Sequence, residues 1–130
     1  MSRTAVPGYA FGDSALARER LAIVADTFEV PTRTLLADLP ALQPRYVLDM
    51  GCGPGHTSAL LRQRFPHSEV TGVDASPAMI DEARDRVTGA WFCVADVTEP
   101  LRLPADVVYA RLLLGHLPDP RAALEHWVRA

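Results

Sequence analysis

The chain has 130 residues, of which 48% are hydrophobic and 22% are charged, and this composition is typical of one globular domain. Its formal net charge of -3 provides no general attraction for nucleic acids or anionic membranes, and no apolar run approaches the roughly 18 residues that suggest a membrane span. The two cysteines, Cys52 and Cys93, form no C-x-x-C motif, which argues against a disulfide framework or a metal site. We therefore expect a cytoplasmic protein without a metal and without nucleic-acid or membrane partners.

Residues 1–44 predict a helical N-terminal arm. Apolar residues recur at roughly helical spacing over residues 13–30. Pro31 disfavours helical geometry in the residue before it, so we expect the first helix to end there. A second helical segment is predicted over residues 32–39.

Strand-like and helix-like segments alternate from Arg45 onward, which predicts an α/β domain with a parallel sheet over residues 45–130. Two of the helices begin with a capping side chain followed by proline, whose missing N–H is harmless at the first helical position. We expect the last helix to bury Leu124, Trp127 and Val128. The strands are predicted at residues 46–50, 69–74, 90–95 and 106–111, and the helices at about 56–64, 77–88 and 121–130.

The segment from Val47 to Gly55 reads VLDMGCGPG, a short apolar strand that runs into a loop with glycine at every second position. Glycine permits positive φ and has no Cβ atom to keep a ligand away from the backbone. The spacing of the three glycines is one residue shorter than in the dinucleotide-binding fingerprint, and the lysine of a phosphate-binding P-loop is absent. The loop therefore indicates a ligand held close to the backbone without a diphosphate.

Three carboxylates come at or next to the ends of successive predicted strands: Asp49, Asp74 and Asp96. Parallel strands direct their carboxyl ends to one rim of the sheet, where open α/β sheets bind ligands. A carboxylate at the end of the second strand is suited to accept hydrogen bonds from ribose hydroxyls, and carboxylates favour a cationic ligand over a phosphate. The pattern predicts a site for a nucleoside that carries a positive charge.

These motifs resemble those of the class I S-adenosyl-L-methionine-dependent methyltransferases, in particular the small-molecule methyltransferases. VLDMGCGPG is similar to the first motif of that family, VDASPAMI to the second, VAD to the third and ADVVYARLLLGHLPDP to the region of the fourth strand. The resemblance covers residues 45–130 and implies a three-layer, Rossmann-like parallel sheet whose first four strands have the order 3-2-1-4. Residues 96–105, at most about 33–36 Å when extended, are long enough for the crossing of about 25 Å that this order requires.

The resemblance implies S-adenosyl-L-methionine as the cofactor and a small-molecule methyl acceptor as the partner. Asp49 would orient the loop or accept from the ammonium group of the cofactor, Asp74 would accept from the ribose hydroxyls, and Asp96 would accept from the adenine amino group. Arg20 would reach the carboxylate of the cofactor. The other expected cofactor-binding residues are Gly51, Cys52, Gly53, Ala75, Met79, Val97, Arg111 and Tyr9.

Structural roles stay open for several of these residues. Aspartate is common in turns, so Asp96 is also a candidate turn residue, whereas Arg111 could form a salt bridge and Arg20 could lie on the solvent face of its helix. His116 is the candidate catalytic base, because a neutral imidazole titrates near physiological pH. A lone histidine in an apolar segment is more often a packed, hydrogen-bonded residue.

The fifth, sixth and seventh strands of the family have no counterpart in the sequence. We therefore expect a partial methyltransferase domain, in which the fourth strand is an exposed edge available for self-association. Three functions stay open: methyl transfer to a small molecule, cofactor binding or a structural role without turnover because the substrate half is absent, and binding of NAD by a Rossmann domain.

Overall fold

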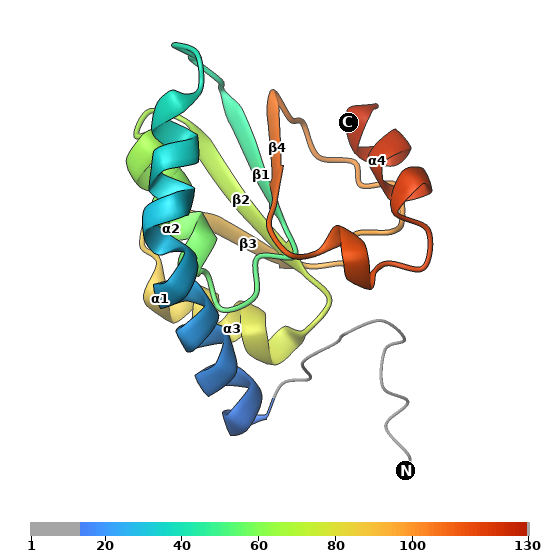
Figure 1. The fold of residues 1–130 in the computed structure, drawn as a ribbon. Coiled ribbons are helices and arrows are strands. Elements are labelled where there is room, and N and C mark those ends of the chain that lie inside the picture. The colour runs from blue at the N-terminus through green and yellow to red at the C-terminus, as the bar shows by residue number, and fades with distance from the viewer. Residues whose placement is uncertain (1–13, 130) are drawn as a thin grey trace.

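The computed structural model of the protein describes residues 14–129. Its centre is a parallel sheet of four strands in the order β3-β2-β1-β4 (Figure 1). The predicted fold class and strand order are therefore confirmed. The first two strands have the predicted bounds, and the other two are one residue shorter at each end than predicted: β1 (Tyr46–Met50), β2 (Glu69–Asp74), β3 (Trp91–Val94) and β4 (Val107–Ala110).

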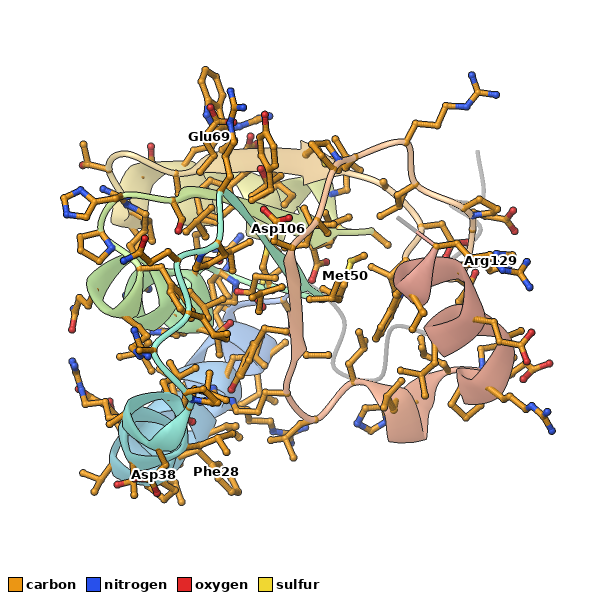
Figure 2. The ribbon with its side chains drawn as sticks, turned by 90° about the horizontal axis from the view of Figure 1, so that it is seen from above. Phe28, Asp38, Met50, Glu69, Asp106 and Arg129 are labelled. Atoms are coloured by element: carbon orange, nitrogen blue, oxygen red, sulfur yellow. The ribbon has the colours of Figure 1, made fainter. Side chains whose placement is uncertain are left out.

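Helices cover both faces of the sheet, so the structure has three layers. One face carries α1 (Ala15–Asp38), α2 (His56–Arg64) and α3 (Pro77–Arg86), and the other carries α4 (Pro120–Val128), which follows the short 3-10 helix η1 (Leu114–His116) (Figure 1). Seen from above, α1 with Phe28 and Asp38 lies on one side of the sheet and α4 with Arg129 lies on the other (Figure 2).

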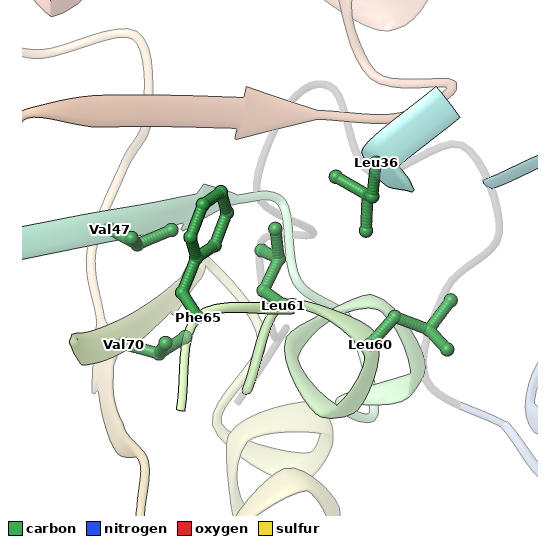
Figure 3. Close-up of a cluster of buried hydrophobic side chains, with 6 residues drawn as sticks. All are labelled: Leu36, Val47, Leu60, Leu61, Phe65 and Val70. Atoms are coloured by element: carbon green, nitrogen blue, oxygen red, sulfur yellow. The ribbon is translucent and has the colours of Figure 1, made fainter. Parts of the chain in front are cut away.

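Side chains of β1 alternate between the two faces, and each face has its own core. Val47 packs with side chains of α1 and α2, whereas Leu48 and Met50 pack with Ala123 and Trp127 of α4. Fully burying an aliphatic side chain contributes about 1.5–3 kcal/mol, so both layers stabilise the central strand. The cluster under α1 and α2 comprises Leu36, Val47, Leu60, Leu61, Phe65 and Val70 (Figure 3).

Asp106 fixes the start of β4 beside β1. Its Oδ2 accepts hydrogen bonds from the backbone N–H groups of Arg45 and Tyr46, both at 2.9 Å. The backbone N–H of Asp106 donates to the carbonyl of Tyr46, also at 2.9 Å. These bonds satisfy backbone groups where the strands begin, at the end opposite to the predicted binding rim.

The prediction that the first helix ends before Pro31 is wrong, because α1 continues through this residue without interruption. Proline removes one backbone hydrogen bond from the helix. However, Ala25 before it and Thr32 and Leu36 after it are buried, with exposed fractions of 7%, 5% and 3%. Packing on both sides of the proline outweighs the lost hydrogen bond.

The predicted buried face of the last helix is correct only in part. Trp127 is 5% exposed, but Leu124 and Val128 are 42% and 84% exposed, and Ala123 is buried instead. The indole Nε1 of Trp127 donates to the carbonyl of Val97 at 2.9 Å. This hydrogen bond and the close approach of Ala123 fix the rotation of α4 about its axis.

Candidate functional site

The glycine loop between β1 and α2 has backbone angles that favour glycine. The φ angle is 67° at Gly51, 53° at Gly53 and 94° at Gly55. The backbone N–H groups of Gly51 and Cys52 both donate to the carbonyl of Val73, at 2.8 and 3.0 Å. The loop is thereby tied to β2 at the carboxyl end of the sheet.

The three glycines have different surroundings. A Cβ atom at Gly51 would lie 2.8 Å from the side chain of Leu113, and one at Gly55 would lie 3.1 Å from that of Val87. Glycine at these two positions therefore also permits close packing. A Cβ atom at Gly53 would meet no other atom within 4 Å. The backbone at Gly53 borders open space, which is what a ligand cradle requires.

Asp74, at the end of β2, is bonded to the same part of the loop. Its Oδ2 accepts from the backbone N–H of Gly53 at 2.9 Å, and its Oδ1 accepts from the backbone N–H of Ser76 at 3.0 Å. Burial raises the pKa of this carboxyl, and the hydrogen bonds from Ser76 and Gly53 act in the opposite direction. A carboxylate offers about four acceptor sites, so Asp74 retains capacity for donors from a ligand.

Asp49 is bonded differently. Its Oδ2 accepts from the hydroxyl groups of Thr57 at 2.6 Å and Ser58 at 2.7 Å, both in the first turn of α2. Asp49 is 1% exposed, and burial raises its pKa to about 6, although the two hydroxyls and Arg111 lower it. These bonds tie β1 to the first turn of α2, and both predicted roles of Asp49, orienting the loop and contact with a ligand's ammonium group, stay predictions.

Three of the predicted cofactor-binding residues lie in the core. The exposed fractions are 4% for Cys52, 0% for Met79 and 7% for Val97. Cys52 packs under α3, and burial raises the pKa of its thiol. Only the backbone of Cys52 is therefore placed to meet a ligand, and the predicted contacts of Met79 and Val97 stay predictions. Ala75, in contrast, is partly exposed at the end of β2.

Asp96 is exposed and forms a local turn. Its Oδ1 accepts from the backbone N–H of Thr98 at 2.9 Å and from the hydroxyl of Thr98 at 2.6 Å. Aspartate commonly bonds to the backbone two residues ahead of it. The structure thus shows the turn that the sequence left open as an alternative, and the contact of Asp96 with adenine stays a prediction.

Arg111, one residue beyond β4, reaches back to α1. Its Nη1 donates to Oγ1 of Thr32 at 3.1 Å, and its guanidinium carbon lies 5.9 Å from the centre of the Phe28 ring. Arg111 therefore joins the edge of the sheet to the N-terminal helix. The next residue, Leu112, has a φ of 56°, so the chain leaves β4 through a conformation that is uncommon for residues other than glycine.

The other predicted residues are exposed or lie outside the described part of the chain. Arg20 is exposed on α1, and His116 is exposed at the end of η1. Tyr9 is outside the described residues. The structure therefore brings together the glycine loop, Asp49 and Asp74 at one rim.

Several side chains beside the loop were not among the site residues predicted from the sequence. Thr57 and Ser58 carry a modest signal, because hydroxyl residues in the first turn after the loop are placed to meet the strand. Nε of Arg86 donates to the carbonyl of Pro54 at 3.0 Å, across a separation of 32 residues. His56 has a buried Nε2 with no hydrogen-bond partner among residues 14–129. No local pattern identifies the contact of Arg86 or the burial of His56 Nε2.

Within residues 14–129, no group of three or more His, Cys, Asp or Glu side chains is arranged to hold a metal ion. The same part of the chain has no helix with the length and apolar character needed to cross a membrane.

Comparison with known proteins identifies relatives of this loop and sheet. Residues 47–130 match the family described as "Methyltransferase domain". Trans-aconitate 2-methyltransferase from Methylobacterium radiotolerans is 46% identical over 91 residues, which are 68% of this chain and 35% of that protein. The enzyme of the same name from Escherichia coli is 42% identical over 99 residues, which are 75% of this chain and 39% of that protein. The chain thus spans less than two fifths of the length of these curated relatives.

Solved structures show the same fold. The plantazolicin methyltransferase BamL, in complex with a triazolic desmethylPZN analog and SAH, superimposes with a TM-score of 0.69 and 23% sequence identity over 85% of this chain and 46% of that chain. The extent of the family match and the identity to the bacterial relatives together assign the family. The chain belongs to the methyltransferase-domain family.

Proposed function

We propose that the chain binds S-adenosyl-L-methionine and forms the cofactor half of an enzyme that methylates a small molecule. The observation that supports this most strongly is the open space at Gly53, whose N–H is held by Asp74 at 2.9 Å. This loop presents backbone and a carboxylate, and it lacks the lysine that would hold a phosphate. Such a cradle fits a nucleoside that carries a cationic group.

The proposed contacts follow the order of the elements. Gly51 and Gly53 allow the methionyl part of the cofactor to approach the backbone, and Asp74 accepts from its ribose hydroxyls. Asp49 keeps α2 in place behind the loop through Thr57 and Ser58. The remaining proposed contacts are those of Cys52, Ala75, Met79, Asp96 and Val97, with Arg20 toward the carboxylate of the cofactor and Tyr9 covering it.

The bound cofactor supplies a methyl group on a positively charged sulfur, which is activated for direct transfer to a nucleophile. The chain's own contribution is to position the reactants and exclude water. For an acceptor that carries a proton, His116 is the candidate base, since its side chain is exposed beyond β4. Trans-aconitate is the first acceptor to assay, because two relatives are named for it.

Binding and turnover are separable in this chain, because it matches only 35% and 39% of the length of those relatives. A cofactor-binding or structural module without turnover is therefore the second candidate function. A domain that binds NAD is a weaker alternative, since the glycine spacing differs from the dinucleotide fingerprint.

Calorimetric titration with S-adenosylhomocysteine and with NAD tests the ligand. We expect saturable binding of S-adenosylhomocysteine and none of NAD, and the reverse result would refute the proposal. A Gly53→Val variant is the matched control, because it fills the open space and cannot adopt a φ of 53° without strain.

A transfer assay with a methyl-labelled donor and trans-aconitate or other small acids then separates the two leading functions. Labelled product from this chain supports the enzyme. Cofactor binding without labelled product, over a broad set of acceptors, supports the module.

The proposal also covers the cellular compartment of the protein and its macromolecular partners. Both cysteines are free thiols, and this favours the reducing cytoplasm. Among the described strands, β4 pairs only with β1, so its other edge is the proposed surface for self-association. The net charge of -3 argues against a nucleic-acid partner.

A further inference from the structure

A small polar pocket lies between α1 and α2, next to the end of the glycine loop. Its volume is about 230 Å³. One water molecule occupies about 30 Å³ in the liquid, so the pocket has room for a small ion together with several waters. Its lining includes three arginines, one histidine and two acidic residues: Arg33, Arg86, Arg111, His56, Asp26 and Glu29.

One ion pair in this lining is already complete. Nη2 of Arg33 lies 3.0 Å from Oε1 of Glu29, and Nη1 of the same arginine donates to Gln63 at 2.6 Å. The charges of Arg33 and Glu29 therefore cancel each other. Among the lining residues, Arg86, Arg111 and Asp26 remain, so the lining carries one excess positive charge, with Asp49 near Arg111 but outside the lining.

Arg86 and Arg111 keep donors for a further partner. Arg86 uses Nε for the carbonyl of Pro54 at 3.0 Å, and Arg111 uses Nη1 for the hydroxyl of Thr32 at 3.1 Å. A guanidinium group has five N–H donors in a fork that matches two oxygens of a carboxylate or a phosphate. These bonds orient both groups and leave most of their donors available.

His56 provides the second, independent observation. Its Nε2 is buried and has no hydrogen-bond partner among residues 14–129, a situation that is unfavourable for a polar atom. Burial is the largest cause that lowers the pKa of this imidazole, and the charges of Arg86 and Arg111 lower it further. The carboxylates of Asp26 and Glu82 raise it. The net effect is a lowered pKa, so the cations and burial outweigh the two carboxylates at this position.

We propose that this pocket is a binding site for a small oxyanion, a carboxylate or a phosphate, that is separate from the cofactor cradle. Arg86 and Arg111 pair with its oxygens. His56 donates a hydrogen bond from Nε2 to the anion, and the bound anion favours the protonated imidazole. The site adjoins the glycine loop, because Arg86 is bonded to Pro54 and His56 is the first residue of α2.

The test is an NMR titration of the 130-residue chain with inorganic phosphate and, separately, with acetate, in which the ring signals of His56 are followed. We expect a saturable shift and an upward movement of the His56 pKa by about one unit, since an opposite charge nearby favours the protonated form. Tighter binding of phosphate identifies a free phosphate as the ligand class, and tighter binding of acetate identifies the carboxylate of a small molecule.

Arg111→Gln removes one cation, and we expect its dissociation constant for the anion to increase at least about tenfold. Arg84→Gln is the matched control, because it removes the same charge from α3 outside the pocket, and we expect a change of less than about twofold. If Arg111→Gln does not fold, as judged by its amide spectrum, Arg86→Gln takes its place.

The titration is repeated with S-adenosylhomocysteine at saturation, which distinguishes this site from the proposed cofactor cradle. An unchanged anion titration supports a separate site. Loss of the anion response under these conditions overturns the proposal, because the pocket then belongs to the cofactor. No response of His56 to either anion, or equal responses of Arg111→Gln and the parent chain, also overturns it. If S-adenosylhomocysteine does not bind, the titration of the free chain decides the matter independently.

Discussion

The carboxylates of Asp49 and Asp74, at the rim of the sheet, bond to different parts of the molecule. Asp49 directs one oxygen toward two hydroxyls of α2 and is 1% exposed, whereas Asp74 divides its oxygens between two backbone N–H groups beside the open space at Gly53. The first carboxylate joins a strand to a helix, and the second joins the end of β2 to the glycine loop. Two residues of one type near the carboxyl ends of adjacent strands, 1% and 3% exposed, therefore make different connections, and only the second is proposed to bind a ligand.

The largest expected effect comes from Asp49→Ala. This change leaves the hydroxyls of Thr57 and Ser58 without their acceptor and creates a void at a fully buried position. We expect a loss of about 4 kcal/mol in the free energy of unfolding, measured by urea denaturation at pH 5. An effect below about 1 kcal/mol would mean that Asp49 does not hold α2.

The second effect is a pH dependence from the same carboxyl. The pKa of Asp49 is about 6 in the folded state and 3.8 in the reference state, so the folded state binds the proton more tightly. The stability that this group contributes is fully present below about pH 4 and is lost as the pH rises through about 6, a change of about 2–3 kcal/mol.

The matched variant for this dependence is Asp49→Asn, which has no titrating group. We expect it to be more destabilised relative to the parent chain at pH 4 than at pH 7, as measured by denaturation at both values. Equal destabilisation at the two values would contradict the raised pKa.

The third effect concerns binding. Asp74→Asn should weaken the binding of S-adenosylhomocysteine by at least about 1 kcal/mol, because a charged acceptor for the ribose hydroxyls becomes neutral. Asp81→Asn is the control, since the Asp81 side chain is 77% exposed and pairs with Arg84 on the same helix. Calorimetry that gives the same affinity for Asp74→Asn and the parent chain would exclude the ribose contact.

The smallest effect is expected on the outer face of α4. Val128 is 84% exposed, so Val128→Ser should change the stability by no more than about 0.5 kcal/mol. The same measurement on Trp127→Ala should show a loss of at least about 3 kcal/mol, since this side chain is 5% exposed. A similar loss in both variants would mean that Val128 is covered in solution.

How well the sequence predicted each element depends on how local its determinants are. The bounds of β1, α2 and β2 are as predicted, because glycines, prolines and caps mark their ends in the sequence itself. The continuation of α1 through Pro31 was missed, since it depends on burial of Thr32 and Leu36 against distant parts of the chain. Local signals thus determine where β1, α2 and β2 begin and end. Tertiary contacts determine whether a helix such as α1 continues through a proline.

The same distinction holds at the candidate site. The glycine loop and Asp74 follow from motif and strand position, and the structure brings them within 2.9 Å of each other. The bond of Arg86 to Pro54 joins the end of α3 to the loop, and no spacing within either segment specifies it. The bond between Asp49 and α2 lies between these cases, because its partners are close in sequence but their rotamers depend on packing.

The hydrogen bond from Trp127 to the carbonyl of Val97 connects the last helix to the segment that crosses from β3 to β4. Residues 95–106 contain no helix or strand, so this contact is one of the anchors that order the crossing. We therefore expect the crossing segment and α4 to open as one cooperative unit, with their amide protons exchanging together and before those of β1 and β2.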